Sequence, residues 1–80
     1  MIKVGILELQ GDFELHHNIL RELGYASFSV KDSTDLENID GLIIPGGEST
    51  TMSLLIDSFN LRKSILDFSK ENPILGTCAG

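Results

Sequence analysis

Residues 41–47 read GLIIPGG. The apolar run from Leu42 to Ile44 is stopped by Pro45 and two glycines, and a short apolar run with such a boundary is typical of a buried strand. Glycine tolerates backbone angles that other residues avoid. The stretch therefore predicts a buried strand whose carboxyl end leads into a tightly folded loop.

The residues before this strand predict a strand, a helix and a second strand. Residues 2–9, IKVGILEL, have the aliphatic character of a strand covered on both faces. Residues 10–23 carry apolar residues at helical spacing, with Asp12 available as N-cap and Gly24 in the C′ position. The apolar positions of this helix are Leu15, Ile19, Leu20 and Leu23.

The remaining segments continue the alternation of strands and helices. Residues 25–30 alternate in the manner of a strand near the sheet edge, and residues 34–38 suit a short helical turn. Helices are expected from Ser49 and over 61–71, followed by a strand over 74–78. We expect a break near Asn60 and a helix end at Pro73, with apolar positions at Met52, Leu55, Ile56, Ile65, Leu66 and Phe68.

This order of elements predicts an α/β domain with a parallel sheet and helices on both faces. Ligands bind to such sheets beyond the carboxyl ends of the strands. Three polar or glycine-rich loops are expected at that edge, namely residues 10–11, 46–48 and 78–80.

Composition excludes several classes of function. The 80 residues carry a net charge of −6 and have a pI near 4.6, which opposes binding to nucleic acid or to anionic membranes. A single cysteine suits a reducing compartment, and neither a leader nor a membrane span is evident. The sequence predicts a cytoplasmic protein whose partner is a small polar molecule or another protein.

Cys78 lies in the pattern GTCAG, residues 76–80. Small neighbours at the end of a buried strand allow the sharp turn of a nucleophile elbow, which presents the reactive side chain to the site. A helix beginning just after the cysteine would lower the pKa of its thiol. The alternative is a buried structural cysteine that packs as a small apolar residue.

The second motif is PGGEST, residues 45–50. Its adjacent glycines suit close approach of backbone N–H groups to a carboxylate or an oxyanion. A phosphate loop is disfavoured, because Glu48 stands where the Walker pattern requires lysine. The structural alternative is a helix start capped by Ser49 or Thr50.

Other polar residues are weaker candidates for a site. His16 and His17 point about 100° apart on a helix, so at most one faces the strand ends, and a surface or interface role is favoured. Gln10, at the end of a buried strand, needs hydrogen-bond partners and could orient a polar substrate. The acidic residues Asp32, Asp35, Glu37 and Asp40 are interpreted as a solvated edge without metal-ligand spacing.

Taken together, LELQGDF at residues 7–13, GLIIPGGESTTM at 41–52 and GTCAG at 76–80 resemble the class I, triad-type glutamine amidotransferases. Within that family they closely resemble the glutaminase subunits of pyridoxal 5′-phosphate synthases. The resemblance covers the whole chain and implies a flavodoxin-like three-layer fold, of which residues 1–80 are the N-terminal portion, ending at the nucleophile elbow.

The resemblance implies roles for individual residues. Cys78 is the nucleophile that attacks the carboxamide of L-glutamine, and the segment Gly46, Gly47 and Glu48 binds this substrate. The oxyanion hole is implied at the backbone N–H groups of Gly47 and Ala79. Gln10 and His16 match positions near the oxyanion hole and the partner interface. No metal and no cofactor is implied.

The resemblance also implies a partner and a missing part. The ammonia released passes to a (β/α)₈-barrel synthase subunit, which makes pyridoxal 5′-phosphate. The family's catalytic His and Glu lie beyond residue 80, so these residues are expected to be a piece of a longer glutaminase and to be inactive alone. The alternatives are a binding or regulatory module without catalysis and a glutaminase serving another synthase.

Overall fold

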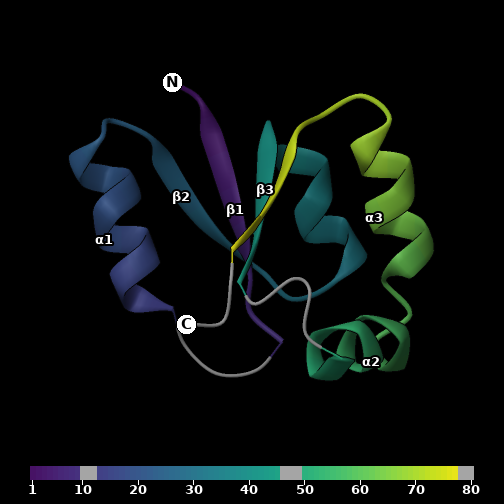
Figure 1. The fold of residues 1–80 in the computed structure, drawn as a ribbon. Helices are drawn as coiled ribbons and strands as arrows, with labels where there is room; N and C mark the ends of the chain where they lie inside the picture. The colour runs from purple at the N-terminus through teal and green to yellow at the C-terminus, as the bar shows by residue number, and fades with distance from the viewer. Residues whose placement is uncertain (10–12, 46–49, 78–80) are drawn as a thin grey trace.

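The computed structural model describes residues 1–9, 13–45 and 50–77. Strands and helices alternate in the predicted order (Figure 1). The elements are β1 (Lys3–Leu7), α1 (Glu14–Glu22), β2 (Ala26–Val30), the 3₁₀ helix η1 (Ser33–Asn38), β3 (Gly41–Pro45), α2 (Thr50–Ser58), α3 (Arg62–Ser69) and β4 (Ile74–Thr77).

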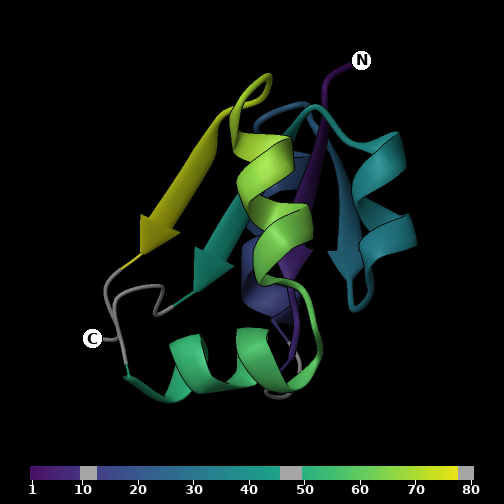
Figure 2. The same cartoon turned by 90° about the vertical axis from the view of Figure 1, so that its right-hand side faces the viewer.

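The strands form one parallel sheet in the order β2-β1-β3-β4. Every connection crosses a sheet face, as parallel neighbours require. Helix α1 covers one face, and η1 and α3 cover the other, with α2 beside the carboxyl end of β3 (Figures 1 and 2). The predicted three-layer, flavodoxin-like α/β architecture and the edge position of β2 are confirmed.

The main hydrophobic core fills the face under η1, α2 and α3. Alternation along β1 and β3 sends Leu7, Leu42 and Ile44 to this face. Gly5 must be small there, because a Cβ atom would lie 2.6 Å from methyl carbons of both Val30 and Ile39. The buried cluster comprises Leu7, Val30, Leu36, Ile39, Leu42, Ile44, Met52, Ile56, Leu61, Ile65 and Phe68.

The break between α2 and α3 lies where the sequence predicted it. Asn60 has φ +56°, a left-handed conformation that asparagine tolerates better than most residues. Arg62 ties the two helices together, because its guanidinium pairs with Asp57 and donates to the Ser53 hydroxyl at 2.7 Å. One detail of α3 was predicted wrongly: Leu66 is 57% exposed, because it points away from the face that buries Ile65 and Phe68.

The ends and the buried face of α1 also differ from expectation in part. Gly24 takes φ +90° just after the helix, as predicted for C′. The N-cap position is Phe13 rather than Asp12. The sheet-facing side holds His17 and Leu20, whereas the other predicted apolar positions, Leu15, Ile19 and Leu23, are exposed. The helix is therefore rotated so that Leu20 alone of the four predicted apolar positions is buried.

The acidic residues of 32–40 lie largely at the surface, as predicted, but two of them have a structural role. Asp32 accepts hydrogen bonds from the N–H groups of Thr34 and Asp35, and Asp35 accepts from the N–H of Asp32, so they form a capping box for η1. Asp40 accepts from the N–H of Lys3 at 2.8 Å, joining η1's far end to β1.

Replacing Asp32 with alanine is expected to lower the melting temperature by a few degrees at pH 7, because η1 loses its cap. The Thr34 hydroxyl, with the N–H groups of Asp35 and Thr34, holds the pKa of Asp32 below its usual 3.8. The stabilisation is thus present above pH 3.8 and is lost as the pH falls through the lowered folded-state pKa. Thermal melts from pH 7 to 2.5 test this.

Glu37→Ala is the matched control, since Glu37 is an exposed acid in the same 3₁₀ helix. A control that melts as early as Asp32→Ala would show that charge, not capping, is responsible.

Candidate active site

The carboxyl ends of β1, β3 and β4 lie at one edge of the sheet. The register pairs Pro45 of β3 with Thr77 of β4, and parallel neighbours lie about 4.8 Å apart. The segments that follow these two strands therefore start side by side. The segment after Leu9 starts from the same edge, since β1 pairs directly with β3.

The principal predicted site residues lie outside the described part of the chain. The structure thus provides the starting points of the three predicted loops but leaves the assignments of their residues as predictions. Those residues are Gln10, Gly46, Gly47, Glu48, Cys78 and Ala79.

His16 is the predicted site residue that the structure describes. It lies in the first turn of α1, partly exposed, and its ring meets that of Phe13 edge-on with centroids 5.6 Å apart. The side chain is thus accessible from the helix start, which is compatible with its predicted role toward a partner.

His17 was expected at the surface or at an interface, and this expectation is wrong. Its side chain is only 10% exposed, and its Nε2 lies 2.8 Å from Oε1 of Glu8. On the other side of the ring, Nδ1 contacts the Ser27 hydroxyl. His17 faces the sheet because polar partners on β2 and just after β1 satisfy both ring nitrogens.

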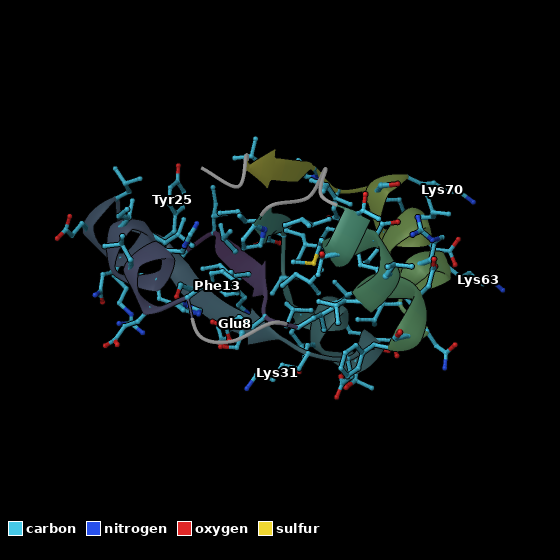
Figure 3. All side chains as sticks on the ribbon, turned by 60° about the horizontal axis from the view of Figure 1, so that its bottom comes forward. Glu8, Phe13, Tyr25, Lys31, Lys63 and Lys70 are labelled. Atoms are coloured by element: carbon cyan, nitrogen blue, oxygen red, sulfur yellow. The ribbon has the colours of Figure 1, made fainter. Side chains whose placement is uncertain are left out.

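Glu8 is the residue that sequence reasoning missed. It directly follows β1, its side chain is 4% exposed, and its Oε1 accepts the N–H of Phe13 at 3.4 Å. Figure 3 shows Glu8 and Phe13 near each other on the α1 side of the molecule. The available signal was a carboxylate inside the apolar run IKVGILEL, because a buried acid requires partners.

These contacts decide the charge of Glu8. Burial by itself favours the neutral acid, but hydrogen bonds from Ser29, His17 and the Phe13 N–H outweigh it and hold the pKa of Glu8 below its usual 4.5. Glu8 is therefore a carboxylate at neutral pH. Because a carboxylate only accepts, Nε2 of His17 carries the donated proton and Nδ1 faces Ser27.

Glu8→Gln is expected to lower the free energy of unfolding by about 2 kcal/mol at pH 7, because hydrogen bonds to a buried carboxylate are lost. A lowered folded-state pKa stabilises the fold above the unfolded value of 4.5, and this contribution disappears as the pH falls through the folded-state value. The difference between wild type and variant should therefore shrink below pH 4.5. Denaturant titrations at pH 7, 5, 4 and 3 measure it.

Glu14→Gln removes an exposed carboxylate from the adjoining first turn of α1 and serves as control for net charge. A Glu8→Gln difference that stays constant down to pH 3 would contradict the assigned carboxylate.

A surface hollow of about 430 Å³ opens beside His17, between α1 and β2. Apart from Phe28, its lining is polar and of mixed charge: Glu14, His17, Arg21, Ser27 and Ser29. Within residues 1–9, 13–45 and 50–77, no three or more His, Cys, Asp or Glu side chains are grouped to hold a metal ion. In the same residues no helix has the length and apolar character needed to cross a bilayer.

Comparison with known proteins extends the geometric argument. Residues 6–80 match the SNO glutamine amidotransferase family. The chain is 47% identical over 79 residues to the pyridoxal 5′-phosphate synthase subunit PdxT of Oenococcus oeni, covering 99% of this chain and 41% of that protein. It is 46% identical over 80 residues to the subunit of the same name from Dehalococcoides mccartyi, with the same coverage.

A solved structure described as a glutamine amidotransferase superposes with a TM-score of 0.82 at 38% identity, covering 96% of this chain and 42% of the other. The chain thus spans about two fifths of the length of its relatives. The match includes all the strands and helices described above, apart from the first residues of β1. The chain belongs to the SNO glutamine amidotransferase family.

Proposed function

We propose that this chain supplies the nucleophile-bearing part of a glutaminase. The observation that carries the proposal is the register of β3 and β4, in which Pro45 pairs with Thr77. The diglycine segment follows Pro45 in the sequence, and the cysteine segment follows Thr77. A nucleophile and the N–H donors that stabilise its oxyanion must lie within a few ångströms of the same carbonyl. The pairing of the two strand ends is compatible with that requirement, and the family membership supports the chemistry.

In the proposed reaction, the Cys78 thiolate attacks the side-chain carboxamide carbon of L-glutamine. The C=O π electrons move to oxygen, and the N–H groups of Gly47 and Ala79 stabilise this oxyanion. Collapse of the intermediate breaks the C–N bond, and the leaving nitrogen takes up a proton and departs as ammonia. Water then hydrolyses the γ-glutamyl thioester to glutamate and regenerates the thiol.

Other residues bind and orient the substrate. Gly46, Gly47 and Glu48 form the proposed glutamine-binding segment, and Gln10 supports the oxyanion hole from the end of β1. No cofactor or metal takes part in this scheme.

The proton-transfer groups are proposed to come from residues outside these 80. His17 is already engaged by Glu8 and Ser27, so it does not serve as the base for Cys78. The relatives are more than twice as long as the matched segment. We therefore assign residues 1–80 to the N-terminal part of a class I amidotransferase domain, with the His and Glu of the triad elsewhere in the protein.

The proposed recipient of the ammonia is a (β/α)₈-barrel subunit of pyridoxal 5′-phosphate synthase in the cytoplasm. The support is that relatives sharing 46–47% identity carry that synthase's name. Affinity purification of the tagged protein at its natural length, followed by mass spectrometry, tests the assignment. Recovery of a different ammonia-consuming synthase would overturn the partner and leave the glutaminase in place.

Labelling with a glutamine-like diazo-ketone tests the chemistry. The protein at its natural length, together with its synthase partner, should gain one adduct on the peptide containing Cys78, and excess L-glutamine should slow the labelling. Cys78→Ser is the negative control. Labelling that glutamine does not slow would favour the alternative of a binding module whose cysteine is an ordinary thiol.

A further inference from the structure

The polar cluster of Glu8, His17, Ser27 and Ser29, hereafter the Glu8–His17 cluster, is a buried feature that the proposed reaction does not use. It joins three parts of the fold, namely the residue that follows β1, the second turn of α1 and the middle of β2. Among residues that the structure describes, Glu8 and His17 are the buried polar or charged side chains. Every buried side-chain nitrogen and oxygen atom in these residues has a partner.

Stability alone does not explain such a cluster. Replacing a buried ion pair with apolar residues of similar volume is often neutral or stabilising. The neighbouring residues on this face, Ile6 and Leu20, show that apolar packing is available between the sheet and α1. What the polar cluster adds is a fixed relative placement of β1, α1 and β2. Hydrogen bonds are satisfied in one arrangement only, whereas apolar contacts tolerate sliding.

This fixed placement lies at the edge of the sheet where the site is proposed. The backbone N–H of Glu8 donates to the carbonyl of Val30 at 2.9 Å, which anchors Glu8 to β2. Its carboxylate accepts from both His17 and the N–H of Phe13. Glu8 therefore links the carboxyl end of β1 to the first turn of α1, across the connection whose sequence contains Gln10.

We infer that Glu8 and His17 are positioning residues for the glutaminase. They hold the end of β1 and the start of α1 in one relative placement, and they thereby fix the two ends of the connection that contains Gln10. The inference rests on the proposed function. It predicts that loss of the pair impairs use of glutamine while leaving the intrinsic reactivity of Cys78 unchanged.

The first test compares Glu8→Gln and His17→Gln with wild type, using the protein at its natural length with its synthase partner. Each variant should lower kcat/KM for glutamine about tenfold, because displacing an aligned group by a fraction of an ångström has effects of this order. Alkylation of Cys78 by iodoacetamide should keep its rate, while labelling by the glutamine-like diazo-ketone should slow.

The second test asks whether the pair acts through the connection. Glu8→Gln should lower kcat/KM for glutamine little further when Gln10 is already alanine. The Glu8→Gln/His17→Gln double variant should have a kcat/KM no lower than that of the single variants. Asp35→Asn is the control for lost stability, since it breaks the capping box on the opposite face and should leave kcat/KM unchanged at assay temperatures below its melting point.

Fully additive effects of Glu8→Gln and Gln10→Ala would overturn the inference, as would an equal fall in kcat/KM in Asp35→Asn. If Glu8→Gln does not fold, Ser29→Ala removes the hydroxyl that contacts Nε2 of His17 at 3.4 Å and should show the same pattern at about threefold. Cys78→Ser separates the two proposals: an active Cys78→Ser variant defeats the glutaminase itself, whereas an inactive one with unaffected Glu8→Gln defeats only the positioning role.

Discussion

Glutamine hydrolysis by the Cys78→Ser variant is expected to fall by about 10⁴-fold or more in kcat. The reason is the difference between the two nucleophiles. A thiol with a pKa near 8.5 or below supplies thiolate at neutral pH, whereas a serine hydroxyl supplies essentially no alkoxide unless the base is arranged for it. The substitution changes one atom, so the glutamine-binding residues are retained and KM should change little.

The measurement is ammonia release by the partner-bound protein at its natural length, under saturating glutamine. Ser58→Ala, at the exposed end of α2, is a control for a comparably small change away from the strand ends and should keep full activity. Residual activity of Cys78→Ser within tenfold of wild type would remove Cys78 from the reaction and with it the proposed function.

Leu61→Ala is expected to lower the free energy of unfolding by about 3 kcal/mol. Leu61 is 1% exposed and lies directly before α3, in the core cluster with Ile56 and Ile65. Its truncation removes apolar contacts and leaves a cavity that the surrounding helices and sheet cannot fully close.

The same substitution five residues later is the matched control. Leu66→Ala lies on α3 with its side chain 57% exposed, and should change the free energy of unfolding by no more than about 0.5 kcal/mol. Urea denaturation of both variants at pH 7 measures the contrast. Equal losses would mean that the described packing of α3 against the sheet is wrong.

The order of elements was predictable from sequence because its signals are local. The apolar run of 41–45, the helical spacing of 61–71 and the break near Asn60 each depend on neighbours within a few positions. The sheet's parallel arrangement followed, because strands separated by helices have few other solutions. The proposed site also derives from local patterns, namely glycine pairs and a cysteine at strand ends.

What the sequence by itself determined, then, was the alternation of strands and helices and the edge at which the candidate loops begin. Only the tertiary structure decided that α1 turns His17 and Leu20 toward the sheet and leaves Leu15, Ile19 and Leu23 exposed, and that Leu66 faces outward. The physical reason is that the partners of His17 are non-local: Glu8, Ser27 and Ser29 meet it only once β1 and β2 have paired in register. No periodicity within the helix encodes a hydrogen bond supplied by two strands.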